Sequence, residues 1–340
     1  MDRGTDLKAV AALAFAVLLL LTGCSSGDKS QQQWVEDEVS FQSDGLTIHG
    51  TYRHQKDAPP GPAALLISES GNTDRNGDNV VVGKIGNMRQ LAEALSDQPD
   101  GKGVASLRYD KVGTGATGLG PFQQRPTEVV SAVYTAGAES AARFLADQPG
   151  TDKNRLSVYA LGEGTVHAMA LAADTSPGAP KIHSLGLLQP LSGRYLDIIT
   201  NRVRSDASPE TLATWLAAVD EVRTTGTVPK DLPEGLGAIL NPGNAKAIVE
   251  ADKIDPVALA AKIPAGTPVL LTCSDTDRQA LCNTMKPLID ALAHTALTVV
   301  ELKGVNHVLR DDPTDSIANL ATDAPLSPQL VDALNGFVTK

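Results

Sequence analysis

The alternation of apolar and polar positions predicts a sheet that begins with an antiparallel hairpin and continues as parallel strands. Residues 35–42 and 46–54 flank the turn residues Ser43-Asp44-Gly45, and apolar positions alternate with polar ones or glycine in the second segment. The later strands are continuous apolar runs, as strands buried on both faces are. These buried strands are predicted at 63–67, 103–108, 156–160, 185–189, 269–273 and 297–302.

Segments with helical spacing lie between these strands. They are predicted at 88–97, 127–148, 163–174, 280–293 and 327–338. Strands that alternate with helices predict an α/β protein with a doubly wound, mostly parallel sheet, here over residues 35–340. Between Ser192 and Ile263 no buried strand is predicted, and residues 210–222 have one apolar face that includes Trp215. We therefore expect an inserted helical cap at about 193–262.

The first 34 residues predict export and attachment to lipid. Arg3 and Lys8 precede an uncharged apolar run at 9–21, too short to span about 30 Å of hydrocarbon but suited to a signal peptide. The run ends in LTGC, which resembles the lipobox of bacterial lipoproteins. Residues 1–23 would be removed, Cys24 acylated, and 24–34 left as a flexible tether on the extracytoplasmic membrane face. A plain signal peptide cut elsewhere is the alternative.

Two further cysteines and the charge balance add to this prediction. In an exported protein, Cys273 and Cys282 can form a disulfide, which would stabilise the fold by roughly 2.7 kcal/mol through lost chain entropy of the unfolded state. Two free thiols are the alternative.

The net charge of −11 argues against nucleic acid as a partner. The histidines have no metal-ligand spacing, and no phosphate-binding loop is apparent, so we expect no metal and no cofactor.

Four segments resemble the α/β-hydrolase superfamily, in particular its branch of bacterial esterases and serine-aminopeptidase-like hydrolases. SESGNTDRNGDN at 68–79 is similar to the oxyanion loop GSGPTDRDGN, and RYDKVGTG at 108–115 is similar to RYDKRGxG. The region 152–172 resembles that around the nucleophile, and 232–256 resembles the end of the cap. This resemblance covers most of residues 35–340. It implies the α/β-hydrolase fold and hydrolysis by a serine, a histidine, an acid and an oxyanion hole.

The resemblance also places the catalytic positions. The nucleophile belongs on the strand-to-helix turn 160–164, where the family has G-x-S-x-G but this chain has Gly162 and thus no hydroxyl. His307, after the last strand, is the candidate base. Asp277 is the candidate acid, with Asp275 as the alternative. The other histidines considered are expected to pack or to face solvent; they are His49, His54, His167 and His183.

The oxyanion-loop region departs from the family as well. The resemblance places Glu69, Ser70, Gly71 and Glu163 around the oxyanion, and Glu69 stands where the family usually has glycine. A carboxylate there is expected to repel a developing oxyanion. Val112 takes the place of an arginine in the next loop. The retained residues Asp74, Arg75 and Gly77 are expected to build the loop.

Three functions are compatible with these departures. The first, which we favour, is a non-catalytic protein that binds a small molecule, a lipid, a peptide or a partner protein in the cleft. The second is an ester or peptide hydrolase with a displaced nucleophile, Ser70 or Thr165, but neither lies on the strained turn. The third is an envelope scaffold with a vestigial cleft.

Overall fold

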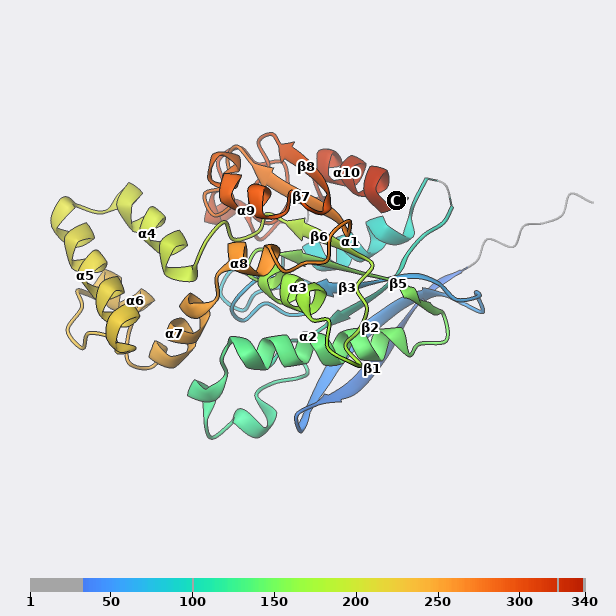
Figure 1. Ribbon diagram of the computed structural model, residues 1–340, viewed down its shortest axis with the longest axis horizontal. Helices are drawn as coiled ribbons and strands as arrows, with labels where there is room; N and C mark the ends of the chain where they lie inside the picture. Colours follow the sequence, from blue (N-terminus) through green and yellow to red (C-terminus); the bar gives the residue numbers. More distant parts are fainter. Residues whose placement is uncertain (1–32, 100, 323, 339–340) are drawn as a thin grey trace, which may run out of the picture. The chain divides into compact units, whose positions relative to one another are not determined.

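The computed structural model describes residues 33–99, 101–322 and 324–338 (Figure 1). Eight strands form one sheet in the order β1-β2-β4-β3-β5-β6-β7-β8. The strands are β1 (Trp34–Ser43), β2 (Leu46–Gln55), β3 (Gly61–Ile67), β4 (Ala105–Tyr109), β5 (Thr151–Leu161), β6 (Ser184–Leu188), β7 (Pro268–Ser274) and β8 (Ala296–Leu302). Strand β2 is antiparallel to β1 and β4, and the other neighbours are parallel. The predicted hairpin followed by parallel strands is confirmed.

Helices cover both faces of the sheet, as the buried strands require (Figure 1). The helices around the sheet are α1 (Asn87–Ser96), α2 (Ser131–Ala146), α3 (Gly164–Ala173), α8 (Pro256–Ala260), α9 (Lys286–Ala291) and α10 (Pro328–Val338). One apolar core joins the sheet to α2, α3 and α9. A second core joins the opposite face to α1 and α10.

Two predicted helices are shorter than their sequence patterns suggested. The segment predicted at 127–148 contains a 3₁₀ turn, Pro126–Glu128, then an extended Val129 before α2 begins at Ser131. The segment predicted at 280–293 is a 3₁₀ turn, Cys282–Thr284, followed by the short α9. Pro287 lies in the first turn of α9 and has no N–H to continue a helix from upstream.

Four helices between β6 and β7 form a group with its own core (Figure 1). They are α4 (Tyr195–Asp206), α5 (Pro209–Thr225), α6 (Glu234–Ile239) and α7 (Ala245–Lys253). Trp215 is fully buried in this core, and its indole N–H donates to the Thr200 hydroxyl at 2.8 Å. Buried Asp252 accepts hydrogen bonds from Arg194 and Arg223, which ties α7 to α4 and α5.

The described part of the chain contains no helix that is both long enough and apolar enough to cross a membrane. The signal segment, Cys24 and nearly all of the predicted tether lie outside the described residues. The proposed lipid attachment therefore stays a prediction.

Candidate active site

Four loops meet at the carboxyl edge of the parallel strands. In such sheets this edge is where the strand-to-helix loops gather and where sites are commonly built. Glu69 follows β3, Gly162 follows β5, Asp277 follows β7 and His307 follows β8. Residues distant in sequence are thus brought together by the strand order.

Gly162 forms the sharp turn between β5 and α3. Its φ is +54°, a left-handed conformation that favours glycine. Its N–H donates to the carbonyl of Leu188 at 3.1 Å, which fixes the turn against β6. A Cβ atom built at Gly162 would lie 1.5 Å from Oε2 of Glu69. The space that a side chain at this turn would need is therefore filled by the Glu69 carboxylate.

His307 is joined to Asp277 by a buried hydrogen bond. The distance from His307 Nδ1 to Asp277 Oδ2 is 2.7 Å, and the Asp277 side chain is fully buried. The other Asp277 oxygen accepts from the N–H of Gln279 at 2.8 Å. The alternative acid, Asp275, accepts from the N–H of Gly304 at 2.8 Å and pairs with Lys303 instead. The histidine partner in this structure is thus Asp277.

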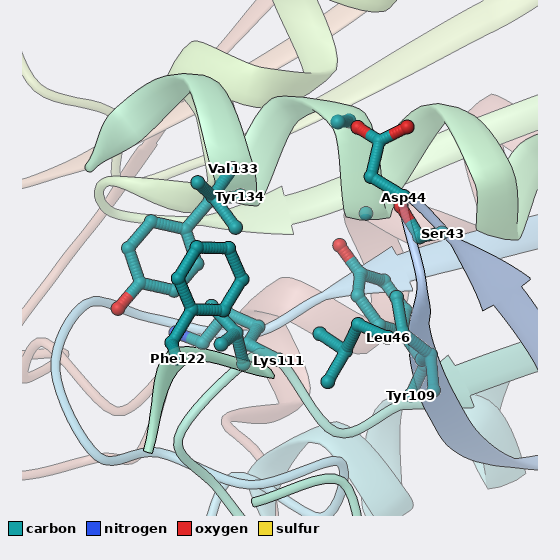
Figure 2. A pocket seen from close by; sticks show the side chains of 12 residues that line it. Ser43, Asp44, Leu46, Tyr109, Lys111, Phe122, Val133 and Tyr134 are labelled. Carbon is teal, nitrogen blue, oxygen red and sulfur yellow. The ribbon is translucent and has the colours of Figure 1, made fainter. Parts of the chain in front are cut away.

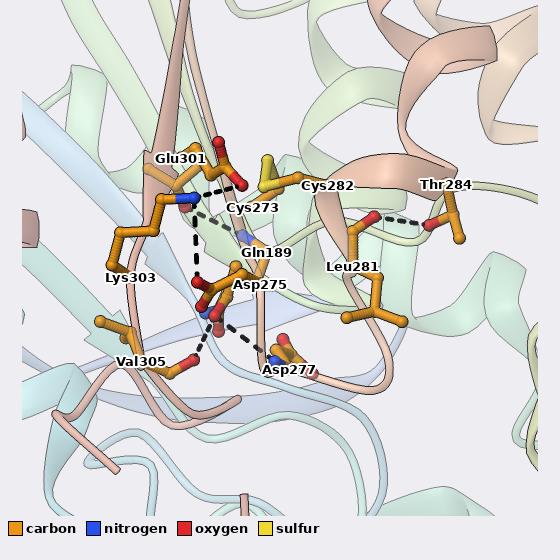
Figure 3. The surroundings of a disulfide bond; sticks show 12 residues. Gln189, Cys273, Asp275, Asp277, Leu281, Cys282, Thr284, Glu301, Lys303 and Val305 are labelled. Carbon is orange, nitrogen blue, oxygen red and sulfur yellow. Dashed lines mark hydrogen bonds and ion pairs between the residues drawn. A yellow bond between two sulfur atoms is a disulfide. The ribbon is translucent and has the colours of Figure 1, made fainter. Parts of the chain in front are cut away.

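Asp277 lies on a loop closed by a disulfide between Cys273 and Cys282 (Figure 3). Cys273 belongs to β7, and Cys282 begins the 3₁₀ turn before α9. The Ser274 hydroxyl inside this loop donates to the carbonyl of Val305 at 2.6 Å. The disulfide and this bond hold the Asp277 loop beside the loop that carries His307.

The Glu69 carboxylate binds on the other side of the histidine. Its Oε2 lies 2.7 Å from His307 Nε2. Its Oε1 accepts from the N–H of Ser70 at 2.5 Å and faces the N–H of Glu163 at 3.4 Å. In this kind of fold, the oxyanion donors are an N–H after the nucleophile and an N–H of the loop after β3. The Glu69 carboxylate therefore faces the backbone N–H groups of Ser70 and Glu163 and the His307 ring at the same time.

The sequence predicts Glu69 in the loop after a buried strand, where it lies, but not what its side chain contacts. The expectation was repulsion of an oxyanion formed by a substrate. In the structure the carboxylate contacts the Ser70 N–H and His307. The sequence signal is the combination of a glycine at position 162 with a long acidic residue at position 69, because a residue without a side chain leaves room for a long one.

The three groups form a charged row, carboxylate–imidazolium–carboxylate. Burial disfavours charge on Glu69, but the His307 imidazolium and the hydrogen bonds from Ser70 outweigh it and lower the Glu69 pKa to about 2. Burial likewise disfavours the His307 cation, but Asp277 and Glu69 raise the His307 pKa well above its ordinary value. At neutral pH, both ring nitrogens of His307 are therefore protonated and donate to carboxylates.

The two hydroxyls considered as displaced nucleophiles have other partners. The Thr165 hydroxyl is fully buried and donates to the carbonyl of Gly162 at 2.6 Å. The Ser70 side chain hydrogen-bonds to Glu69. Since the His307 nitrogens are held by Asp277 and Glu69, neither hydroxyl is paired with the base.

Residues retained from the oxyanion-loop pattern build its backbone. Arg75 pairs with buried Asp110 at 3.0 Å, which joins this loop to the one after β4. The Asp74 carboxylate accepts from the N–H groups of Asn76 and Asp78 at 2.8 and 3.0 Å. Arg75 and Asp74 thus shape the loop from which Glu69 extends. Val112, which departs from the family pattern in the next loop, packs in the main apolar core.

A small hollow adjoins this site. Its walls include Ser70, Gly71, Glu163 and His167, and its volume is about 10 Å³, which is room for about one water molecule. His167 Nδ1 lies 2.9 Å from the Thr135 hydroxyl, and burial together with the Lys111 charge lowers the His167 pKa to about 3. His167 is therefore neutral. Within the described ranges, no three His, Cys, Asp or Glu side chains are grouped to hold a metal ion.

Comparison with known proteins identifies the fold. No family model matches this chain, and no curated protein matches its sequence. Est1E from Butyrivibrio proteoclasticus, solved with ferulic acid bound, is 16% identical over 88% of this chain and 98% of that one, with a TM-score of 0.56. The α/β hydrolase GrgF from Penicillium sp. sh18 is 15% identical over 90% and 100%, with a TM-score of 0.55. The esterase rPPE is 16% identical over 91% and 82%, with a TM-score of 0.51. The chain has the α/β-hydrolase fold, as predicted.

Proposed function

We propose that this protein is a pseudo-hydrolase, a ligand- or partner-binding lipoprotein anchored through Cys24 to the extracytoplasmic face of a bacterial membrane. In this proposal Gly162 stands where a serine hydrolase carries its nucleophile. The observation that supports it best is the Glu69 carboxylate, which binds His307 at 2.7 Å and takes the Ser70 N–H with its other oxygen.

Each component of serine hydrolysis is affected. Loss of the nucleophile alone lowers kcat on the order of a millionfold, with residual rate left to binding and the oxyanion hole. Here Glu69 fills that hole, so the residual contribution is removed too. His307 carries protons on both nitrogens and cannot accept another.

The remaining cleft offers a surface for binding. The hollow beside Glu69 has room for about one water molecule, so a ligand at this point would insert at most one small group such as a hydroxyl. No hydrogen bond or ion pair joins the Glu163 carboxylate to another residue in the described part of the chain. Glu163 lines this hollow and a neighbouring one whose walls include Val166 and Tyr195. The Glu163 carboxylate can therefore accept a hydrogen bond from a small molecule, a lipid head group or a peptide.

A fluorophosphonate probe tests the proposal. The wild type should stay unlabelled, and so should Glu69→Gly, because neither has a nucleophile on the turn. Gly162→Ser alone should label poorly, since its Cβ would meet the Glu69 carboxylate at 1.5 Å. The double variant Glu69→Gly/Gly162→Ser should label about a hundredfold faster than Gly162→Ser or more, on the order of the effect of one oxyanion donor.

The four variants form a matched set, read by gel fluorescence and peptide mapping. Stoichiometric labelling of the wild type at Ser70 or Thr165 would contradict the proposal and establish a displaced nucleophile. Equal labelling of the single and double serine variants would show that Glu69 does not block the site.

A further inference from the structure

A groove lies at the amino edge of the parallel strands, at the opposite end of the strands from Glu69 and His307. Its walls are the loop 174–183, which precedes β6, and the segment 264–268, which leads into β7. Its volume is about 640 Å³, within the range of roughly 300–1,000 Å³ that small-molecule sites have. The hollow between the β1–β2 hairpin and α2 is far smaller, about 40 Å³ (Figure 2). The groove at the amino edge therefore has room for a ligand.

Hydrogen bonds hold both walls of this groove in place. Arg143 of α2 donates to the carbonyl of Gly178 in the first wall. In the second wall, the N–H of Gly266 donates to the carbonyl of His294 at 3.0 Å. The groove is thus formed before any ligand binds, which lowers the entropy cost of binding.

Most of the surface inside the groove is apolar. It comes mainly from Ala179, Pro180, Ile182, Pro264 and Ala265. A ligand segment that covers these side chains removes apolar surface from water, which is favourable. The groove therefore favours a ligand with an apolar segment.

The exposed Lys181 lines the groove and has no acidic partner. No hydrogen bond or ion pair joins its ammonium group to another residue that the structure describes. Asp174, the acid in the wall, accepts a hydrogen bond from the N–H of Ser176 at 2.9 Å. That hydrogen bond and the Arg143 cation lower the pKa of Asp174, so the Asp174 charge already has a counter-charge nearby. The charge left without a counterpart is that of Lys181, which favours an anionic head group.

The described chain begins at this same edge of the sheet. Trp34 starts β1 beside the loop that precedes β4, where a Cβ atom built at Gly103 would lie 2.4 Å from the Trp34 ring. Cys24, the proposed site of acylation, precedes Trp34 by a short segment. With the chain anchored as proposed, the amino edge is the edge next to the bilayer. The amphiphiles within reach of the groove are then the lipids of that bilayer.

We propose that this groove binds a phospholipid with an anionic head group. The head group would lie against Lys181, and the first part of one acyl chain would cover Pro180, Ile182 and Pro264. Removal of that apolar segment from water would supply affinity, and the lysine would supply the preference for an anionic head group. The choice of a bilayer lipid rests on the proposed anchoring at Cys24, whereas the shape and charge of the groove do not.

Two short-chain lipids that differ in head-group charge test the groove: dihexanoyl-phosphatidylglycerol, which is anionic, and dihexanoyl-phosphatidylcholine, which is zwitterionic. Both are titrated as monomers into the soluble Cys24→Ala protein and followed by ligand-observed NMR. The anionic lipid should bind roughly fivefold more tightly, on the order of the effect of one lysine beside an anionic head group. Lys181→Gln should remove this preference and leave the affinity for the zwitterionic lipid unchanged. Lys230→Gln, at an exposed lysine between α5 and α6, is the matched control and should keep the preference.

A second pair of variants tests whether the lipids occupy the groove itself. Ala265→Trp should abolish binding of both lipids, because its ring fills the groove. Ala217→Trp, which adds the same ring at an exposed position of α5, should bind both lipids as before. Ala179→Trp fills the groove from the other wall and replaces Ala265→Trp if that variant does not fold, as judged by circular dichroism.

Several results would overturn the proposal. They are no saturable binding of either lipid, undiminished binding by a folded groove-filling variant, or a preference for the anionic lipid that survives Lys181→Gln. Binding of glycerol 3-phosphate as tightly as the anionic lipid would also overturn it, because the groove would then take a soluble phosphate ester. The titrations use a protein without Cys24, so their failure would leave the proposed anchoring standing, and acyl labelling tests that anchoring separately.

Discussion

At the scale of single residues, the charges of Glu69 and His307 depend on each other. The Glu69 pKa falls from 4.5 to about 2, so its contribution to stability is present above pH 4.5 and is lost as the pH falls toward 2. The His307 pKa is raised above 6.5, so its contribution is complete below pH 6.5 and is lost as the pH rises through the folded-state value. Both contributions are therefore present together between about pH 4.5 and 6.5.

Substitution of Glu69 by glutamine tests this coupling. In Glu69→Gln the NMR-measured pKa of His307 should fall, because one of its two carboxylate partners is gone while Asp277 remains. The variant should be less stable at pH 6 by about 1.5–3 kcal/mol, the range for a hydrogen bond to a charged group, and should lose less stability between pH 4.5 and 2. Glu139→Gln, in an exposed pair with Arg143, is the control and should leave the His307 titration unchanged. An unaltered His307 pKa in Glu69→Gln would exclude the ion pair.

At the scale of elements, the end of β7 is held by the Cys273–Cys282 disulfide. The cross-link restricts the unfolded chain, so Cys282→Ser should lower the free energy of unfolding by about 2–3 kcal/mol. Reductant should destabilise the wild type by a similar amount and leave the variant unchanged. Peptide mapping without reductant should recover the linked pair. Two alkylatable thiols in the native protein would contradict the assignment.

At the scale of the whole molecule, the described chain begins across the sheet from the site. Trp34 pairs with Gln55, and Arg53 pairs with Ser106 near the start of β4. The chain thus enters at the amino edge of the parallel strands, while Glu69 and His307 lie at the carboxyl edge. If Cys24 is acylated, the nine residues between Cys24 and Trp34 could span at most about 30–35 Å. We therefore expect the cleft to be accessible from the aqueous side.

Lipid attachment itself is tested by Cys24→Ala. The variant should lose metabolic acyl labelling and move from the membrane fraction to the soluble fraction, because the acyl chains that hold the protein on the bilayer are gone. Cys282→Ser serves as a matched cysteine control and should keep both properties. Continued labelling and membrane retention of Cys24→Ala would refute the lipobox assignment.

The sequence by itself determined the order of strands and helices, because burial on two faces and helical spacing leave apolar patterns that need no tertiary information. It also determined that the β5–α3 turn has no hydroxyl, since Gly162 is read directly. The choice of Asp277 and His307 came from the resemblance to the hydrolase family, and the strand pattern placed both residues in loops. The predicted helices at 127–148 and 280–293 were too long. The apolar pattern does not show that Val129 is extended or that Pro287 limits where a helix can begin.

Only the tertiary structure decided what fills the site. Glu69 and Gly162 are 93 residues apart, and no local pattern tells that the carboxylate of one occupies the space left by the other. The choice of Asp277 over Asp275 as the partner of His307 was settled in the same way. Hydrogen bonds between loops depend on strand order and on side-chain reach to within an ångström, which a linear pattern does not encode.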